Sequence, residues 1–150
     1  MSVPVRQARR AEAESILPLY EWLFAPPGSE PPAWDPAVAL ERVGETISSP
    51  GSTIFVADDA GRLVGICSAY LDLNSVRYGR RCWVEDLAVD PARRSAGIGR
   101  ALLGAAREWA REQGATHLEL DSGAARTDAH RFYERERPSW AGMQYAWWLP

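Results

Sequence analysis

One short stretch of the chain carries residues of the kind that bind phosphate groups. It reads Arg94, Ser95, Ala96, Gly97, Ile98, Gly99 and Arg100. A helix that begins here leaves its first N–H groups without partners, and the helix dipole favours an anion beside them. Glycine has no Cβ, so Gly97 and Gly99 allow the backbone to approach a phosphate closely. The stretch therefore predicts a cradle for a pyrophosphate group.

Two common phosphate-binding motifs do not match this stretch. A dinucleotide-binding loop needs Gly-x-Gly-x-x-Gly in a first βαβ unit, and a P-loop needs Gly-Lys-Ser/Thr. The chain has no lysine, since all 17 of its basic residues are arginine. Three of them, Arg93, Arg94 and Arg100, surround the stretch and supply positive charge. The cradle must therefore belong to another class of phosphate-binding loop.

Three segments, in a fixed order, resemble the GNAT superfamily of N-acetyltransferases. Residues 94–99 are similar to the family's acetyl-CoA loop, Gln/Arg-x-x-Gly-x-Gly/Ala. Residues 85–91, Glu-Asp-Leu-Ala-Val-Asp-Pro, resemble the family's fourth strand and the turn after it. Residues 129–134, Ala-His-Arg-Phe-Tyr-Glu, are similar to its Ala-x-x-Phe-Tyr-Glu helix. The resemblance covers residues 80–135 and implies an enzyme that moves an acetyl group from acetyl-CoA to a primary amine, by direct attack in a ternary complex.

The rest of the chain divides into apolar periodic segments and turns. Strands are expected over residues 3–6, 52–57, 63–71, 80–89 and 117–121, and a final strand or hairpin over residues 139–149. Helices are expected over residues 12–23, 36–49, 98–113 and 126–134. Pro18 is expected to split or kink the first helix. The resemblance implies one domain over residues 1–150 with the α/β (α+β) GNAT fold, a mixed, mostly antiparallel sheet flanked by helices, with strands four and five splayed apart.

The resemblance also assigns roles to residues on the fourth strand and the last helix. Backbone groups of Leu87, Ala88 and Val89 are implied to pair with the pantetheine arm of acetyl-CoA, as an added strand would. Tyr133 matches the family's general acid, whose hydroxyl protonates the leaving thiolate. A phenol, with a reference pKa of about 10, can donate such a proton.

Four carboxylates are candidates for the general base that removes a proton from the amine. We favour Glu85 on the fourth strand ahead of Glu119 on the fifth, and Asp86 and Asp121 stay open as alternatives. Successive residues of a strand point to opposite faces of the sheet. Only one of Glu85 and Asp86 is therefore expected to face the amine.

The sequence departs from the family pattern at two places. The family has an asparagine seven residues before the tyrosine, which binds the pantetheine arm, and this chain has Arg126 there. Ser122, Thr127 or Asp128 could replace that contact. The pair at residues 137–138, Arg-Pro, stands where the family has Gly-Phe, so the connection from the last helix to the final strand is expected to differ.

Aromatic and acidic residues indicate the class of acceptor. In GNAT proteins the acceptor pocket is built by the region of the first two helices and by the loop before the fourth strand. Those regions supply Trp22, Phe24, Trp34, Asp35, Asp72, Tyr78 and Trp83. Cation–π contacts and charge pairing suit an amine that is cationic in water, so a small-molecule amine is the expected partner. A protein or peptide N-acetyltransferase and a non-catalytic acyl-CoA-binding sensor remain alternatives.

Composition limits the other possibilities. With 150 residues, 46% of them hydrophobic and 25% charged, the chain suits one globular domain. It has no apolar run of about 18 residues and no signal-peptide pattern, so no membrane partner and a cytoplasmic location are expected. The net charge of −3 and the lack of a basic face argue against a nucleic-acid partner.

The two cysteines and two histidines do not form a metal-binding pattern, so no metal is expected. Cys67 and Cys82 are expected on neighbouring strands that pair about a turn at residues 72–79, where they could face each other as thiols. The resemblance also implies a homodimer, with Trp147 and Trp148 as candidate interface residues.

Overall fold

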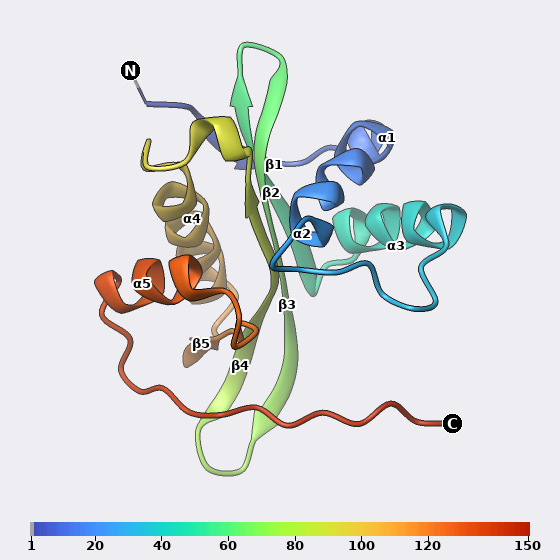
Figure 1. Cartoon of the computed structure of the whole chain (residues 1–150). Coiled ribbons are helices and arrows are strands. Elements are labelled where there is room, and N and C mark those ends of the chain that lie inside the picture. Colours follow the sequence, from blue (N-terminus) through green and yellow to red (C-terminus); the bar gives the residue numbers. More distant parts are fainter. Residues whose placement is uncertain (1) are drawn as a thin grey trace.

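The computed structural model describes residues 2–150 and consists of one sheet with helices on both faces (Figure 1). The strands are β1 (Val5–Gln7), β2 (Ser52–Asp59), β3 (Arg62–Ser75), β4 (Gly79–Val89) and β5 (His117–Glu119). They lie in the order β1-β2-β3-β4-β5. All neighbours are antiparallel except β4 and β5, which are parallel. The sheet is therefore mixed and mostly antiparallel, as expected from the sequence.

Two groups of helices flank this sheet. The first consists of η1 (Arg10–Glu12), α1 (Ala13–Ile16), η2 (Leu17–Tyr20), α2 (Glu21–Phe24) and α3 (Pro36–Ser48). The second consists of the short η3 (Pro91–Arg93), α4 (Ile98–Glu112) and α5 (Thr127–Arg135). Figure 1 shows the two groups on opposite sides of the sheet. Nowhere in residues 2–150 is a helix both long enough and apolar enough to cross a membrane.

Alternating side chains on the central strands build a core on each face of the sheet. On β2, Ile54 and Val56 pack against α1 and α3. Phe55 and Ala57 point the other way and pack against α4. Because helices cover both faces, β2 and β3 are buried over five and six consecutive residues. This two-sided burial explains why both strands read as nearly continuous apolar runs.

Two sequence signals at helix ends are confirmed. Pro18 lies in η2, where a 3₁₀ turn interrupts the helical run between α1 and α2. Proline has no N–H and cannot make the helical hydrogen bond to the residue four positions before it. At the start of α3, the Asp35 carboxylate accepts a hydrogen bond of 3.0 Å from the N–H of Ala37, and Pro36 is the first helical residue.

Strand β4 contains an extra residue opposite β3. Two neighbouring residues of β3 face Val84 and Asp86, so Glu85 between them has no partner of its own. Such a β-bulge reverses the alternation of the residues that follow it. Val84 packs against α4, and in a regular strand Ala88 would share that face. Ala88 instead packs with the core under α1 and α3, and Asp86 is turned to that side with it.

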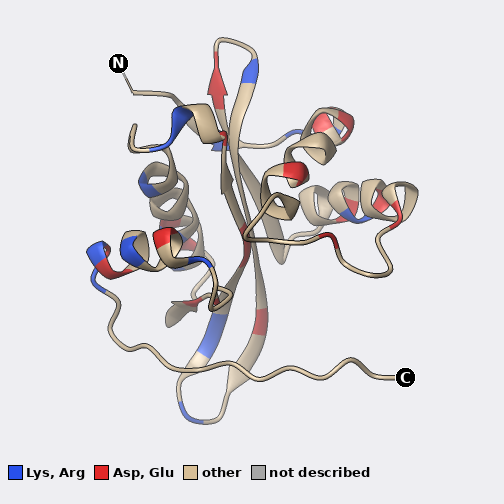
Figure 2. Cartoon of the chain, in the orientation of Figure 1, with Lys and Arg blue, Asp and Glu red and all other residues tan. Residues whose placement is uncertain are grey.

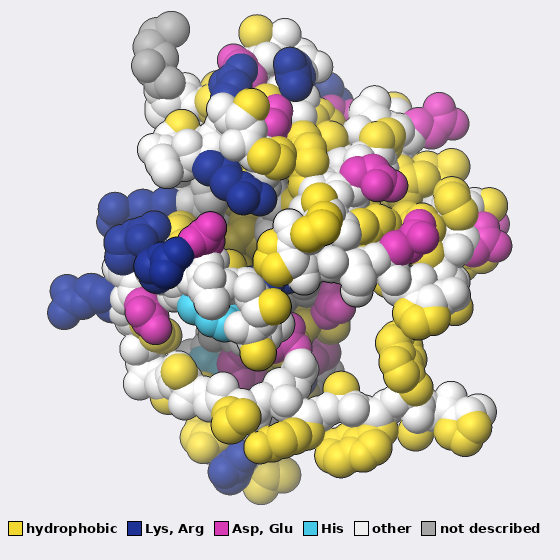
Figure 3. All heavy atoms as spheres, in the orientation of Figure 1, with side chains coloured by type: hydrophobic (Ala, Val, Ile, Leu, Met, Phe, Trp, Pro, Cys, Tyr) yellow, Lys and Arg dark blue, Asp and Glu magenta, His cyan; other side chains and the backbone are white. Residues whose placement is uncertain are grey.

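Segment 139–150 does not form the final strand or hairpin that the sequence predicts. It is extended but makes no backbone hydrogen bond with residues 2–150, so it belongs to no sheet. Its apolar pattern suits a strand, but a strand also needs a partner's edge to satisfy its N–H and C=O groups. The Trp140 ring stacks on Tyr78 at the turn between β3 and β4, with centroids 5.6 Å apart. Figure 3 shows a row of exposed hydrophobic side chains along this end of the molecule.

The two cysteines lie on neighbouring strands, as expected, but they do not face each other. Cys67 of β3 lies opposite Leu87, and Cys82 of β4 lies opposite Leu71. The two cysteines are at unequal distances from the turn that joins the strands, so the register separates them. Both are buried free thiols, and burial raises the pKa of Cys67 to about 12.

Candidate active site

A cleft of about 330 Å³ opens at the middle of β4. Its walls come from α2 and the loop after it, from β4, from the segment after β5, and from α5. Three carboxylates line it, those of Glu85, Asp86 and Asp121, together with the phenol of Tyr133. Its other aromatic residues are Tyr20, Phe24 and Trp34. The cleft therefore brings acid–base groups together with an aromatic wall.

The cleft exists because β4 and β5 pair over a short distance. Their pairing ends at Trp83 of β4 and Glu119 of β5. Strand β4 continues to Val89, and residues 84–89 have no neighbour on this side within the described part of the chain. The two strands therefore splay apart, as the resemblance implies.

The free edge of β4 exposes particular backbone groups. The N–H of Asp90 donates to the carbonyl of Val64 on β3, with a length of 2.9 Å. Residues of an antiparallel strand alternate in the direction of their N–H and C=O groups, so those of Ala88 also face β3. The groups of Leu87 and Val89 then face the open edge. These two residues, of the three predicted to bind pantetheine, have free backbone groups.

Asp86 is held by two hydroxyl donors within the cleft. Its Oδ2 accepts hydrogen bonds from Tyr20 Oη at 2.8 Å and from Ser68 Oγ at 2.9 Å. Its Oδ1 accepts no hydrogen bond from residues 2–150 and is open to a donor in the cleft. Burial raises the pKa of Asp86, and the two hydroxyl donors act in the opposite direction. Sequence reasoning missed Tyr20 and Ser68, because no local pattern connects them to Asp86.

Glu85, the bulge residue, lies at the exposed rim of the cleft. Its Oε2 accepts hydrogen bonds from Trp83 Nε1 at 2.7 Å and from Tyr70 Oη at 3.1 Å. Both Glu85 and Asp86 line the cleft, so the expectation that only one of them faces it is wrong. That expectation assumed a regular strand, and the bulge breaks the alternation at this residue.

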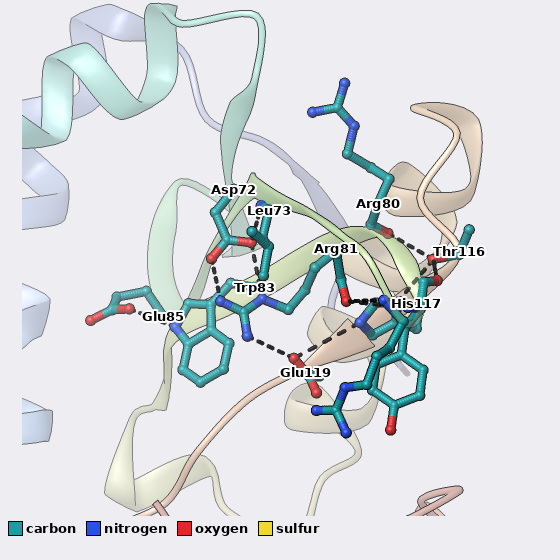
Figure 4. Close-up of polar contacts among 12 residues, drawn as sticks. Asp72, Leu73, Arg80, Arg81, Trp83, Glu85, Thr116, His117 and Glu119 are labelled. Carbon is teal, nitrogen blue, oxygen red and sulfur yellow. Dashed lines mark hydrogen bonds and ion pairs between the residues drawn. The ribbon is translucent and has the colours of Figure 1, made fainter. Parts of the chain in front are cut away.

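Glu119 lies outside the cleft, in a polar cluster on the adjoining part of the sheet (Figure 4). Its Oε2 accepts a hydrogen bond of 2.9 Å from Arg81 Nη1. Arg81 also forms an ion pair with Asp72 at 2.7 Å, and its guanidinium lies 5.0 Å from the centre of the Trp83 ring. Three residues predicted for the site, Glu119, Asp72 and Trp83, are thus gathered around Arg81, apart from Tyr133.

The other predicted acceptor residues divide between the cleft and the rest of the structure. Phe24 and Trp34 line the cleft, with their rings edge to face and their centroids 4.7 Å apart. Trp22 packs against the core under α1 and α3, and Asp35 caps α3. Tyr78 lies at the turn between β3 and β4. Aromatic composition alone did not distinguish these positions.

Tyr133 enters the cleft from α5. Burial raises the pKa of its phenol to about 12, while the charge of Arg126 acts to lower it. The phenol therefore keeps its proton near neutral pH, as a general acid must until it donates. Tyr133 of α5 and Asp86 of β4 line the same cleft.

The segment between β5 and α5 adds two further polar side chains to the cleft, Ser122 and Arg126. Ser122 Oγ is buried and has no hydrogen-bond partner within residues 2–150. A buried hydroxyl without a partner costs about 1–3 kcal/mol, which a bound ligand can recover. Arg126 Nη2 donates a hydrogen bond of 2.8 Å to the carbonyl of Leu23, on the opposite wall. Sequence reasoning named Ser122 as a ligand contact but missed this bond between distant segments.

The predicted phosphate cradle forms the turn before α4. Gly97, the residue before the helix, has a φ of +80°, a conformation that favours glycine. A Cβ at Gly97 would meet nothing within 4 Å, so this side of the turn is open to a ligand. The N–H of Ala101 bonds back to the Gly97 carbonyl at 3.0 Å, and the three N–H groups before it have no helical partner.

Gly99 has a different role from the one that the sequence suggests. A Cβ at Gly99 would point into the protein, 3.6 Å from the Phe132 ring and 3.8 Å from Val89. The small residue lies where α4 comes close to α5 and β4, so its missing side chain does not open the cradle to a phosphate.

The three arginines around the cradle have different partners. Arg93 forms an ion pair with Asp59, and Arg100 Nε lies 3.7 Å from Glu136 Oε1. Arg94 is exposed and forms no ion pair with residues 2–150. Arg94 therefore has the guanidinium most available to an incoming phosphate.

Charge separates the two arms of the molecule (Figure 2). Residues 13–48, which contain α1 to α3, include six carboxylates and one arginine. Residues 91–137, which contain η3, α4 and α5, include nine arginines and seven carboxylates. One wall of the cleft thus belongs to an acidic arm, and the other belongs to an arm that is slightly basic.

Comparison with known proteins identifies the family. The acetyltransferase (GNAT) family matches residues 14–137. An uncharacterised N-acetyltransferase of Bacillus subtilis, YhdJ, is 34% identical over 94 residues, which are 63% of this chain and 66% of YhdJ. Aminoglycoside N(6')-acetyltransferase type 1 of Stenotrophomonas maltophilia is 30% identical over 130 residues, 84% of this chain and 79% of that protein. A solved structure of AAC(6')-Iy with a CoA bisubstrate analogue has a TM-score of 0.81, at 17% identity, over 99% of this chain and 100% of that one.

The family match includes β4 and α5, which line the cleft, and the cradle before α4. The likeness to AAC(6')-Iy shows a shared fold. The chain therefore belongs to the GNAT family of acetyltransferases and is an N-acetyltransferase.

Proposed function

We propose that this enzyme transfers an acetyl group from acetyl-CoA to a primary amine of a small cationic molecule, by direct attack in a ternary complex. The observation that carries the proposal is the cleft with two unlike walls. The wall formed by α2 and its loop is aromatic, and Glu85 and Asp86 of β4 lie beside it, which suits a cationic amine. The free edge of β4 and the slightly basic arm that carries the cradle suit an anionic co-substrate with amide groups.

Three features fit acetyl-CoA on the second wall. The free backbone groups of Leu87 and Val89 would pair with the pantetheine amides as a neighbouring strand does. Ser122 Oγ, which is buried without a partner, would gain one. The turn at Gly97 and the first N–H groups of α4 would hold the pyrophosphate, with Arg94 beside them. Acetyl-CoA supplies the thioester carbon that the amine attacks.

Asp86 is better placed than Glu85 or Glu119 to accept the proton from the amine. Its Oδ1 is open to the cleft, and burial brings its affinity for a proton closer to neutral pH. Glu85 lies at the rim, where its Oε2 already accepts two hydrogen bonds, and Glu119 is paired with Arg81. We therefore assign the base to Asp86 and infer that Glu85 attracts the cationic acceptor.

The transfer balances through two protein groups. The amine nitrogen bonds to the thioester carbonyl carbon as the carbon–sulfur bond breaks. The ammonium group of the acceptor first releases one proton to solvent. A second proton passes from the nitrogen to Asp86 and one passes from the Tyr133 hydroxyl to the departing sulfur, and proton exchange with solvent then returns both side chains to their starting states. Both groups line the cleft, which supports this assignment.

Two relatives support a small acceptor. The Stenotrophomonas relative is named for aminoglycosides. Aminoalkylphosphonate N-acetyltransferase of Salmonella typhimurium is 38% identical over 76 residues, 51% of this chain and 49% of that protein. Aminoglycosides and aminoalkylphosphonates are small polar molecules with primary amines. We infer an acceptor of this general class, with the carboxylates of the cleft favouring compounds that carry positive charge.

Release of CoA thiol from acetyl-CoA, measured over a panel of amines, tests the proposed function. The panel contains an aminoglycoside, a polyamine, an aminoalkylphosphonate and a peptide. We expect release with a cationic small molecule and tight binding of acetyl-CoA by calorimetry. Gly97→Val should weaken that binding about tenfold, because a β-branched residue is strained at a φ of +80°.

Each other outcome of this panel has a definite meaning. Acetyl-CoA binding without release on any amine would favour the sensor alternative over the proposed enzyme. Release with the peptide alone would replace the small acceptor with a protein substrate. Unchanged acetyl-CoA binding by the Gly97→Val variant would show that the turn at Gly97 does not bind the pyrophosphate.

Tyr133→Phe tests the general acid. We expect kcat to fall by about 10²–10⁴-fold while acetyl-CoA still binds, since the ring stays and only the proton donor is lost. Tyr78→Phe is the matched control, because Tyr78 lies at the turn between β3 and β4, outside the cleft. Undiminished turnover by Tyr133→Phe would show that another group protonates the thiolate.

Asp86→Asn and Glu85→Gln separate the two candidate bases. The base must be ionised, so the rate should rise as pH increases through its pKa. Because the pKa of Asp86 is raised, this rise should begin above the usual range for an aspartate. We expect Asp86→Asn to lower kcat about 100-fold or more and to abolish the rise, whereas Glu85→Gln keeps it. The opposite pattern in steady-state kinetics would return the role to Glu85.

We also propose that two copies associate through segment 139–150. Its large apolar side chains are between 53% and 88% exposed. Four of them, Met143, Tyr145, Trp147 and Leu149, alternate along the segment and would share one face of a strand. The outer edge of β5 has no partner within residues 2–150 and could receive such a strand.

The exposed face supplies part of the area that a dimer needs. Tyr145 and Trp147 lie on that face, and at roughly 150–250 Å² each they supply about 400 Å². Met143, Leu149 and the added strand would supply the rest of the ~800 Å² that each partner contributes to a stable interface. Light scattering should therefore give the mass of a dimer, and the double change Tyr145→Asp and Trp147→Asp should give a monomer. Gln144→Asp is the control, because Gln144 lies on the other face of the segment, and this variant should stay dimeric. A monomeric mass for the unaltered protein would contradict the proposal.

A further inference from the structure

Arg126 stands where the family pattern has asparagine, and its longer side chain makes a contact across the cleft. It is the residue before α5, and its Nη2 donates to the carbonyl oxygen of Leu23 at 2.8 Å. Leu23 lies in α2, and both residues line the cleft. The hydrogen bond therefore joins α2, on the side of the cleft where we propose the acceptor binds, to the start of α5, which carries Tyr133. The two residues are 103 positions apart in the chain.

The Leu23 carbonyl accepts this bond because it lies at a helix end. The last carbonyls of a helix lack partners within it. The N–H of Ala25 donates a hydrogen bond of 3.0 Å to the carbonyl of Glu21, and Arg126 Nη2 donates one to the carbonyl of Leu23. A guanidinium is also favoured at the end of a helix, where the dipole is negative. The contact thus combines a charge-assisted hydrogen bond with a helix cap.

Gly28 allows the acceptor loop, residues 25–34, to fold directly onto this bond. A Cβ at Gly28 would lie 2.5 Å from Arg126 Nη2 and 1.9 Å from the Leu23 oxygen. The backbone bonds of the loop are three local ones, from Ala25 to Glu21, from Gly28 to Ala25 and from Trp34 to Pro31, and the Trp34 ring packs on Tyr20 and Phe24. Arg126 therefore connects the end of α2, onto which this loop folds, to α5.

The backbone of Arg126 is itself firmly placed. Its N–H donates to the Gly123 carbonyl at 3.0 Å, and its carbonyl accepts from the N–H of His130 at 3.1 Å. Tyr133 lies seven residues further along, about two helical turns, and so shares the same side of α5. A continuous series of contacts therefore runs from the end of α2, beside the acceptor loop, through Arg126 to Tyr133.

We propose that Arg126 is a positioning residue that clamps the acceptor loop to α5 and so holds the amine in line with Tyr133. It acts through the loop and need not touch either substrate. The catalytic consequence rests on the proposed function, but the clamp itself does not. An asparagine at this position would not reach the Leu23 carbonyl, because its side chain is shorter.

Hydrogen exchange of the loop amides tests the clamp without any substrate. In Arg126→Met we expect the amides of residues 25–34 to exchange at least about tenfold faster, the change expected from losing one bond to a charged group. Arg126→Lys should restore part of the protection, since it keeps a donor. Arg131→Met is the matched control, because Arg131 lies on the same helix and pairs only with Asp128 there. Equal exchange in Arg126→Met and the unaltered protein would overturn the proposal.

Steady-state kinetics test the consequence for the reaction. With an amine that supports turnover, Arg126→Met should raise the KM for the amine about tenfold and leave the KM for acetyl-CoA unchanged. A rise in the KM for acetyl-CoA alone would instead make Arg126 a ligand of the co-substrate and overturn the clamp. If no amine on the panel reacts, the proposed function fails, while the exchange result still decides the clamp.

Gly28→Ala provides a second test that keeps the arginine. Its Cβ would clash with the backbone oxygen of Leu23 and with Arg126 Nη2, so it should speed exchange of the loop amides at least as much as Arg126→Met does. Unchanged exchange in Gly28→Ala would show that the loop does not pack on this bond, against the proposal.

Discussion

The short pairing of β5 with β4 is the constraint on which the site depends. Arg81 fixes where this pairing lies, because it bonds Glu119 of β5 and Asp72 of β3 from its own place on β4 (Figure 4). Thr116 Oγ1 adds a hydrogen bond of 3.0 Å to the carbonyl of Arg80. Beyond these contacts the strands separate. The polar cluster of Arg81, Glu119 and Asp72 does not line the cleft, but it fixes the point at which the free edge of β4 begins.

The bulge at Glu85 then decides which groups the cleft contains. A regular β4 would turn Asp86 toward α4, on the same face as Val84. The extra residue turns it toward Tyr20 instead, where two hydroxyl donors hold it. One inserted residue thus places a buried carboxylate on the acceptor side and leaves a second, Glu85, at the rim. The strand edge and the acid–base groups are consequences of two neighbouring irregularities in the same strand.

The parts of this structure that local sequence encodes were predictable. The helix pattern, the turn at Gly97 and the helix start at Asp35 each depend on residues close together in the chain. The bulge was not predictable, because it is a property of two strands in register and leaves no period in either one. The bond from Arg126 to Leu23 joins residues 103 positions apart, and no spacing rule reaches so far. Segment 139–150 has the pattern of a strand, but a pattern cannot state which edge will receive it.

The buried carboxylate also has a cost for the fold. Because burial raises the pKa of Asp86, the folded protein holds its proton at pH values where the unfolded chain has lost it. Its contribution to stability is therefore greatest below the ordinary aspartate pKa of 3.8 and declines as pH rises through the raised value. Tyr20 and Ser68 offset part of this cost by donating to Oδ2, yet Oδ1 stays open to the cleft. A carboxylate satisfied on both oxygens would be more stable and a weaker base, so the incomplete solvation of Asp86 is what makes the position useful for taking a proton.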